Sequence, residues 1–364
     1  MVTLNALQIR LYRFSLPLKR PFRVGKSTVR QREGILLTIQ DAQGRLGMGE
    51  ASPLPGLHAE TLQQAERELK EFKTRFSGHN MPLAPSNDWQ TELTLFLRDF
   101  KRYPSVGMAI ESALIDLFMQ QGRAAFKAFS AIDSIKVEVN ALVYGNGDEI
   151  MAQTDRKLRQ GYRSLKLKVG RQPLHSEIGV LKKWFGYLPP SIKIRLDANR
   201  SWSLKQACRL GELPAEAIEY VEEPLENPSE LSLFFKRTAI PVAWDESLAE
   251  MNDSPSEPIE GLGAVVLKPT VLGGWRVAFR WGRWAAANGV KVVLSDTVSS
   301  GIGLWATARL AVALDSQTAH GLDTYQWLAE DLLDPPLSFE NGKLTVPSSA
   351  EISKRMRWER LSEV

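Results

Sequence analysis

The chain of 364 residues is too long for one small hydrophobic core, so we expect two packed units or one large barrel with a cap. Its 43% apolar and 24% charged residues are ordinary for a globular protein, and no apolar run approaches the roughly 18 residues that span a bilayer. A net charge of +4 without a long basic run, a start that does not look like a signal peptide, and one cysteine argue against three classes: nucleic-acid-binding, membrane and disulfide-rich secreted proteins. We therefore expect a cytoplasmic protein.

The N-terminal part predicts an α+β unit, which we place at residues 1–131. Its strand-like segments are Leu7–Leu16, Ile35–Ile39 and Leu46–Glu50, with a turn at Asp41–Gly44. Helical patterns follow at Glu60–Phe76 and Ser105–Gln121. The stretch Ser77–Tyr103 between them holds proline and glycine and is the part least expected to form regular structure.

From residue 132 to residue 324 the chain repeats a short β-rich run, a loop and a helix. The expected strands are Lys136–Val143, Ser164–Val169, Lys193–Asp197, Glu219–Glu222, Val242–Asp245, Ala264–Lys268 and Lys291–Ser295. A strand, a helix and two loops fit the spacing of these runs, and parallel strands need such a crossover helix. Seven to eight units in succession predict an α/β fold, a modified (β/α)-barrel. We expect residues 325–364 to return to the N-terminal unit.

Two lysines lie on one face of a predicted barrel strand. Lys166 and Lys168 are two residues apart, so their side chains point the same way, while Leu165, Leu167 and Val169 fill the other face. An isolated Lys-x-Lys is usually a solvated pair. In a barrel covered outside by helices the lysine face has to point inward, where the ammonium groups need carboxylates or a substrate.

Three acidic residues end the next three predicted strands. They are Asp197, Glu222 and Asp245, with gaps of 222 − 197 = 25 and 245 − 222 = 23 residues, one repeat each. Each alone reads equally well as a helix cap or a surface acid. Together they predict converging carboxylates, because neighbouring strands are about 4.8 Å apart.

Converging carboxylates repel one another unless a cation lies between them, so these residues predict a metal site. Oxygen ligands alone suit Mg²⁺, and the chain has only four scattered histidines, which argues against zinc. Lys268 follows one repeat later, 268 − 245 = 23, and we expect it to face the lysine pair across the barrel mouth. Lysines on both sides of a metal-bound carboxylate suit removal of a weakly acidic α-proton, and a lysine beside an ion and other lysines has its pKa lowered.

These motifs resemble the enolase superfamily, in the branch of the muconate-lactonising enzymes. The matching segments, in family order, are Lys166-Leu167-Lys168, Asp197-Ala198-Asn199, Glu222-Glu223-Pro224, Asp245-Glu246-Ser247 and Lys268 with Gly273-Gly274 behind it. Within that branch the chain is most similar to the o-succinylbenzoate synthases, in Gly49–Gly56 with Glu60–Leu62, in Pro104-Ser105 with Ile110–Leu114, and in Gly321–Tyr325. The stretch Ser295–Gly301 departs from the Glu-Ser-Ser wording common in the branch.

The resemblance implies a capping domain at the N-terminus and a Mg²⁺-dependent dehydration, with Mn²⁺ as an alternative metal. It implies catalytic roles for Lys168 and Lys268, substrate contacts for Lys166 and Asn199, and metal ligation by Asp197, Glu222 and Asp245. Loops at Phe22–Ser27 and Pro53–Thr61 would close over the substrate. The substrate would be a small carboxylate whose product feeds menaquinone or phylloquinone synthesis, and no protein partner is indicated.

Other functions remain open at this point. A dipeptide epimerase or a cycloisomerase of the same branch would use the same residues. A catalytically silent barrel that serves as an interaction module predicts the decay of a ligand or lysine, which is not observed. A hydrolase with a histidine–carboxylate metal site is disfavoured by the scarcity of histidine.

Overall fold

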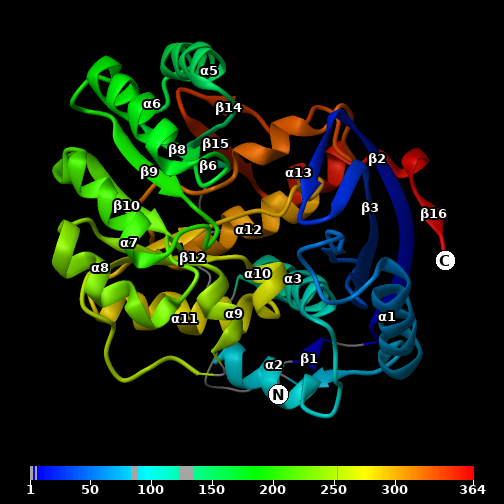
Figure 1. Cartoon of the computed structure of the whole chain (residues 1–364). Coiled ribbons are helices and arrows are strands. Elements are labelled where there is room, and N and C mark those ends of the chain that lie inside the picture. Colours follow the sequence, from blue (N-terminus) through cyan, green and yellow to red (C-terminus); the bar gives the residue numbers. More distant parts are fainter. Residues whose placement is uncertain (1–2, 5, 83–87, 123–133, 252) are drawn as a thin grey trace.

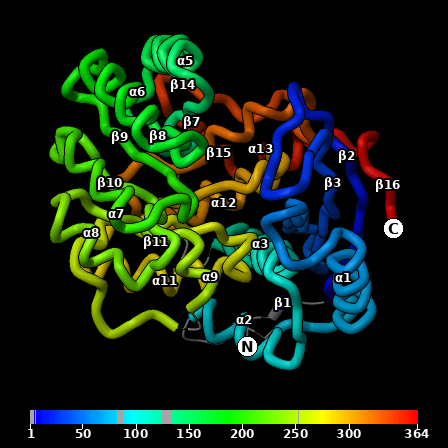
Figure 2. The backbone as a smooth tube through the Cα atoms, viewed as in Figure 1, coloured from blue at the N-terminus to red at the C-terminus, as the bar shows by residue number. Residues whose placement is uncertain are grey.

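The structure, a computed structural model, describes residues 3–4, 6–82, 88–122, 134–251 and 253–364. Two parts lie side by side in Figure 1, with most strands and helices of residues 134–294 on the left, and the N-terminal strands together with the C-terminal end of the chain on the right. The same path of the chain can be followed as a tube in Figure 2.

A seven-stranded parallel sheet forms the larger part. Its strands, in spatial order, are β7 (Ala141–Val143), β8 (Ser164–Lys168), β9 (Lys193–Asp197), β10 (Ile218–Glu222), β11 (Val242–Trp244), β12 (Leu262–Leu267) and β13 (Lys291–Leu294). The segment His320–Gly321 bridges the two edge strands, because His320 pairs with Val139 and Gly321 pairs with Ser295. The sheet therefore curls into a barrel, and the predicted fold class is confirmed.

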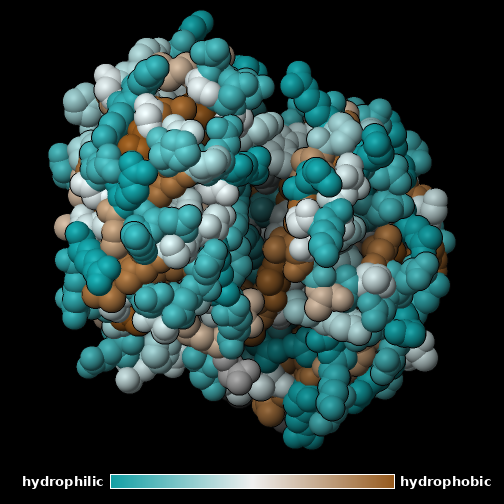
Figure 3. All heavy atoms as spheres, in the orientation of Figure 1, coloured by the Kyte–Doolittle hydropathy of each residue, from teal (hydrophilic) through white to brown (hydrophobic). Residues whose placement is uncertain are grey.

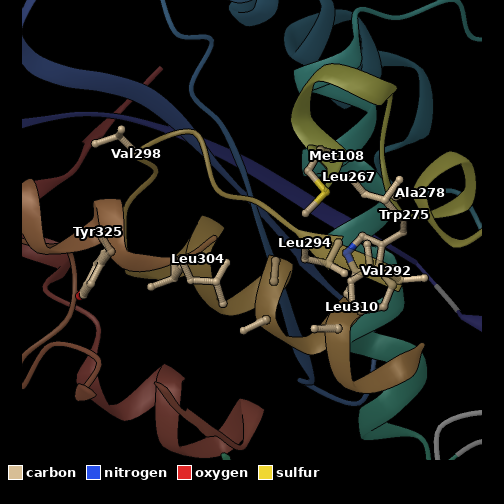
Figure 4. Packing of buried hydrophobic residues seen from close by; sticks show 14 of the residues in the cluster. Met108, Leu267, Trp275, Ala278, Val292, Leu294, Val298, Leu304, Leu310 and Tyr325 are labelled. Atoms are coloured by element: carbon tan, nitrogen blue, oxygen red, sulfur yellow. The ribbon is translucent and has the colours of Figure 1, made fainter. Parts of the chain in front are cut away.

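Helices between the strands cover the outside of the barrel. They are α5 (Gly147–Arg159), α6 (Leu174–Tyr187), α7 (Leu204–Ala207), α8 (Leu231–Thr238), α9 (Glu246–Glu250), α10 (Pro269–Leu272), α11 (Trp275–Ala287) and α12 (Gly301–Ala313). In α11 the buried residues Trp275, Ala278, Trp281 and Ala285 recur at helical spacing and so form one apolar face. Figure 4 shows Trp275 and Ala278 packed with Leu267 and Leu294 of the neighbouring strands.

The N-terminal unit is an antiparallel sheet with helices. β2 (Gln8–Val24), β3 (Ser27–Gln40) and β4 (Leu46–Ala51) pair in order, and β16 (Ser362–Glu363) adds to the edge of β2. The short strands β1 (Thr3–Leu4) and β5 (Met81–Pro82) pair with each other. Its helices are α1 (Leu62–Phe76), α2 (Trp89–Leu97) and α3 (Pro104–Gln120). Because β16 comes from the end of the chain, the last residues lie against the first unit.

Two local predictions are wrong. Lys136–Val143 is not one strand: β6 (Ser134–Glu138) pairs antiparallel with β15 (Lys343–Pro347), whereas β7 joins the barrel. Ser77–Tyr103 contains α2, which begins after Asp88 caps the backbone N–H groups of Gln90 and Thr91. The predicted loop at Phe22–Ser27 is the tip of the long β2–β3 hairpin.

The remaining elements complete the C-terminal segment. β14 (Phe339–Glu340) pairs with β15, and α13 (Ser349–Arg355) follows. The predicted boundary between residues 131 and 132 lies outside the described residues, so the division into three segments stays a prediction. Among the described helices, none has the length and apolar composition that a bilayer span requires.

Candidate active site

The predicted site residues meet at the carboxyl ends of consecutive barrel strands. Lys168, the last residue of β8, is paired in register with Asp197 of β9, and Asp197 is paired with Glu222 of β10. Asp245 follows β11, and Lys268 follows β12. Because β8 to β12 are neighbours in this order, the two catalytic lysine candidates flank the three acids.

The lysine ammonium groups lie directly against these carboxylates. Lys166 Nζ is 2.8 Å from Asp197 Oδ2 and 2.6 Å from Glu222 Oε2. Lys168 Nζ donates to Asp197 Oδ2 at 2.6 Å, and Lys268 Nζ donates to Asp245 Oδ2. The predicted inward lysine face therefore exists, and the three lysines and three acids form one charged cluster.

Asn199 joins the cluster although β9 ends at Asp197. Its backbone adopts a left-handed conformation, with φ of 43°, that turns the chain after the strand. Its side-chain oxygen accepts from Lys168 Nζ at 2.8 Å, and its nitrogen donates to Glu246 Oε1 at 2.9 Å. Asn199 thus orients the same ammonium group that Asp197 holds.

The two adjacent glutamates point to different partners. Glu222 faces Lys166, whereas the fully buried Glu223 accepts from the backbone N–H groups of Asp245 and Ser247 at 2.9 and 2.8 Å. Arg200 Nε neutralises Glu223 at 3.0 Å. Glu223 therefore fixes the backbone on which Asp245 is carried.

Burial and charge give the cluster strongly perturbed protonation equilibria. Burial and then the neighbouring charge of Asp197 raise the pKa of Glu222 well above its ordinary value. Burial opposes the charged ammonium of Lys268, but Asp245 and Glu222 raise its pKa, and the pKa of Lys166 is likewise raised by Asp197 and Glu222. At Lys166 and Lys268 the neighbouring carboxylates therefore outweigh burial and the other lysines.

The donor set fits a hard divalent cation. As the side chains stand, no three His, Cys, Asp or Glu side chains of the described residues are placed to hold one ion together, and the lysine ammonium groups lie against the acids. Asp197, Glu222 and Asp245 are nevertheless 1%, 0% and 6% exposed, so their mutual repulsion is poorly screened. A cation among the three would relieve the penalty seen at Glu222, and oxygen donors suit Mg²⁺.

A cavity of about 460 Å³ opens above the cluster, between the barrel and the N-terminal unit. The face in Figure 3 is hollowed between these two parts. The barrel contributes the charged residues, and the hairpin tip (Phe22–Gly25) and the segment from Leu54 to Leu57 contribute a largely apolar wall. The cavity therefore has a polar floor and a mixed, partly apolar cover.

Residues outside the predicted site set form the far wall of this cavity. Asp296, Thr297 and Val298 follow β13 and line the cavity, and Glu50 and Arg32 reach this segment from the N-terminal unit. The position of Asp296 after a barrel strand, as for Asp197 and Asp245, was the available signal. Nothing in the local sequence of Glu50 or Arg32 predicts contacts more than 200 residues away.

Two family profiles match the chain. One described as "Enolase C-terminal domain-like" matches residues 149–351, and one described as "MenC, N-terminal domain" matches residues 6–97. The first covers the barrel strands from β8 to β13, which carry the charged cluster, and the second covers β2 to β5 with α1 and α2 of the N-terminal unit.

Individual relatives agree with these profiles. An o-succinylbenzoate synthase of Haemophilus influenzae is 29% identical over 89% of this chain and 91% of its own length. "Protein PHYLLO, chloroplastic" of Arabidopsis thaliana is 29% identical over 83% of this chain, which spans only 20% of that larger protein. A solved dipeptide epimerase from Methylococcus capsulatus, complexed with Mg and the dipeptide L-Arg-D-Lys, superimposes with a TM-score of 0.73 at 25% identity, over 95% of this chain and 98% of its own.

Proposed function

The chain belongs to the enolase C-terminal domain-like family, and we propose that it is an o-succinylbenzoate synthase, a Mg²⁺-dependent carbon–oxygen lyase. The observation that carries the reaction type is the strand order, which places Lys168 and Lys268 on either side of three buried carboxylates. The relatives that share most of its length carry the choice of substrate. The chain is one of the enzymes that supply menaquinone or phylloquinone synthesis, and we place it in the cytoplasm.

The proposed substrate is 2-succinyl-6-hydroxy-2,4-cyclohexadiene-1-carboxylate, and the product is 2-succinylbenzoate with one water. Asp197, Glu222 and Asp245 are the proposed Mg²⁺ ligands, with Mn²⁺ as a substitute. When bound, the divalent cation would neutralise the ring carboxylate and stabilise the negative charge that develops next to it.

Lys168 carries the proton in both steps of this proposal. Its neutral amine takes the proton from the ring carbon that bears the carboxylate, and the C–H electron pair moves into the enediolate. The enediolate then expels the ring hydroxyl, which leaves as water with the proton from Lys168. The same lysine can serve both steps because the proton and the hydroxyl leave from one face, and aromatisation of the ring drives the elimination.

The other polar residues orient and stabilise. Asp197 and Asn199 hold the Lys168 ammonium at 2.6 and 2.8 Å and so keep it aimed at one face of the substrate. Lys268, four strands along the sheet, stays protonated and attracts the anionic intermediate. Lys166 contributes positive charge near the ring carboxylate. The cavity wall made by the hairpin tip and Leu54 limits access of water to the reacting carbon.

A direct assay tests this function. The purified chain with Mg²⁺ should convert the cyclohexadiene acid to 2-succinylbenzoate, followed by liquid chromatography and mass spectrometry. A dipeptide epimerase would instead wash deuterium from D₂O into the α-position of L-Ala-L-Glu without net conversion of the cyclohexadiene acid. That second outcome would replace the proposed substrate, and inactivity toward both would support the silent-barrel alternative.

A further inference from the structure

We propose that Arg32, on strand β3 of the N-terminal unit, is a positioning residue that holds the barrel segment Asp296–Ser300 in the shape that walls the substrate cavity. The inference rests on the proposed function only for the identity of the ligand. It assigns a substrate-positioning role to a side chain that does not itself line the cavity.

Val298 is the strained point of this segment. Its φ is +60°, a left-handed conformation that a β-branched residue rarely adopts, and its side chain is only 3% exposed. Figure 4 shows Val298 on the loop that precedes α12, and its side chain belongs to the buried hydrophobic cluster. Such a conformation persists only where surrounding contacts impose it. Within the segment, the Asp296 carboxylate accepts from the Ser299 backbone N–H at 3.0 Å, and contacts from the N-terminal unit add to this bond.

Arg32 supplies a contact at this point. Its Nε donates to the Val298 carbonyl oxygen at 2.8 Å, and its Nη2 donates to the Ser52 carbonyl oxygen. The side chain is 1% exposed, so both bonds form away from water. One rigid guanidinium thus links the strained barrel residue to the segment that follows β4.

Charges around Arg32 make this placement stable. Burial lowers the pKa of the guanidinium, and the nearby carboxylates of Glu50 and Asp296 oppose this effect. Glu50 also accepts from the Ser300 and Gly303 backbone N–H groups, each at 3.1 Å, at the start of α12. The N-terminal unit therefore contacts this barrel segment at two places, and of the bonds from Arg32 and Glu50 it is the Arg32 bond that reaches the strained residue.

The segment is placed to select the substrate rather than to perform chemistry. Asp296, Thr297 and Val298 line the same cavity as Lys168, and we expect the succinyl arm to lie against them when the ring faces that lysine. This is also the stretch whose sequence departs from the wording common in the branch. The shape of this segment therefore depends on the contacts that hold it in this chain. The Arg32 bond is one of them, and a single substitution removes it.

A second buried arginine offers a matched control. Arg309 on α12 is 5% exposed, lies over the Trp305 ring and pairs with Asp116 of α3 at 2.7 Å. Like Arg32 it joins the barrel to the N-terminal unit, but it does not line the active-site cavity. If buried arginines only stabilise the contact between the barrel and the N-terminal unit, the two substitutions should have the same effect on KM and on the melting temperature.

The test compares Arg32→Met with Arg309→Met in the full-length chain. For Arg32→Met we expect KM to rise about tenfold or more with kcat within about threefold, because binding is lost while Lys168 keeps its partners. Arg309→Met should leave KM unchanged even where it lowers the melting temperature. Unchanged KM in a folded Arg32→Met protein would overturn the proposal.

The strained residue provides a rescue experiment. Glycine adopts φ near +60° without penalty, so Val298→Gly removes the need for the Arg32 bond. The double variant Arg32→Met/Val298→Gly should recover KM to within about threefold of Val298→Gly alone. Simple additivity of the two substitutions would contradict the mechanism. If Arg32→Met does not fold, Arg32→Lys, which keeps the charge but loses the fork, should raise KM and be rescued in the same way.

Two readouts do not need turnover. Hydrogen exchange at the Ser299 and Ser300 amides should be about tenfold faster in Arg32→Met than in wild type, and unchanged in Arg309→Met. The dissociation constant of 2-succinylbenzoate should rise in parallel with KM. A wild-type chain that exchanges as expected but does not dehydrate the cyclohexadiene acid would refute the proposed function and leave the positioning role of Arg32 standing. Equal exchange in the three proteins would refute that role.

Discussion

The floor and the far wall of the cavity are built in different ways. On the floor, five consecutive strands deliver six charged residues at the same edge of the sheet, two of them from β8, so local repeats of the sequence create the site. At the wall, Arg32 and Glu50 reach Val298 and Ser300 across sequence separations of 266 and 250 residues. The chemistry thus depends on barrel register, whereas substrate fit depends on how the N-terminal unit sits on the barrel.

The largest effect should come from the floor, on removal of the proton-carrying lysine. Lys168→Ala should lower kcat by about 10⁴-fold or more, because general acid–base catalysis contributes up to that amount and one residue serves both proton transfers. The fold should survive, since Lys168 closes only one side of the charged cluster. Steady-state kinetics and circular dichroism of the variant measure both.

The matched control is Lys182→Ala. Lys182 is an exposed lysine on α6 that pairs with Glu212, far from the cavity lining. It should retain wild-type kcat and KM. Near-normal turnover in Lys168→Ala would mean that Lys268 or Lys166 carries the acid–base role. It would also contradict the assignment of the chemistry to Lys168 on the floor of the cavity.

The proposed metal ligands should show the next largest effect. Wild-type protein should be stabilised by Mg²⁺, by about 2.7 kcal/mol at a hundredfold excess over Kd, because the ion binds the folded state. Asp245→Asn should lose most of this stabilisation together with about 10²-fold or more of kcat. Thermal melts with and without Mg²⁺ measure the binding separately from activity.

A substitution at the surface serves as its control. Asp253 is an exposed acid whose side chain is 81% accessible and pairs with Arg280, so Asp253→Asn should keep the Mg²⁺ response. EDTA should stop turnover of the wild type, and Mg²⁺ or Mn²⁺ should restore it. A Mg²⁺ response that persists in Asp245→Asn would place the ion elsewhere.

Acidic pH should lower the free energy of unfolding through His58, a residue of the N-terminal unit. Burial lowers the pKa of His58 to about 4, whereas an unfolded histidine titrates near 6.5, so the unfolded state binds more protons between these values. The folded state is therefore favoured above pH 6.5, and this contribution is lost as pH falls. At pH 5 the loss amounts to about 2 kcal/mol.

Urea denaturation of wild type and His58→Gln tests this sign. Between pH 7 and pH 5 the wild type should lose about 2 kcal/mol more free energy of unfolding than His58→Gln. His79, which is exposed, gives the control substitution His79→Gln, with a wild-type pH response. Equal losses in wild type and His58→Gln would show that His58 is protonated in the folded protein as readily as in the unfolded chain.

The extent to which sequence predicts this molecule follows the same division. The barrel class and the contacts among Lys166, Lys168, Asp197 and Glu222 could be predicted, because periodic strands of parallel register repeat the same geometry. The split of Lys136–Val143 between two sheets could not, since it depends on pairing with β15, more than 200 residues later. The hydrogen bond that Glu223 accepts from the backbone of Asp245 could not be predicted either. Sequence alone does not distinguish two adjacent glutamates, and only the backbone shows which one faces the barrel interior.

The smallest expected effect is a change in KM on substitution of the exposed arginines at the opening of the cavity. No acidic residue precedes Glu33, and Arg23 of the hairpin tip and Arg171 after β8 are exposed at the cavity lining. The proposed substrate carries two carboxylates, so Arg23→Gln and Arg171→Gln should each raise KM by about two- to fivefold, with kcat unchanged. Arg20→Gln on the same hairpin, outside the lining, should have no effect at all.

Salt distinguishes steering at the mouth from a fixed contact within the cavity. The Debye length falls from about 10 Å at 0.1 M to about 3 Å at 1 M ionic strength, so a steering effect of Arg23 should vanish at high salt. The KM defect of Arg32→Met should persist there, because it arises from the shape of a buried segment. If both defects disappear together at high salt, the wall acts on the substrate through charge, and the contrast between long-range shape and local charge would no longer hold.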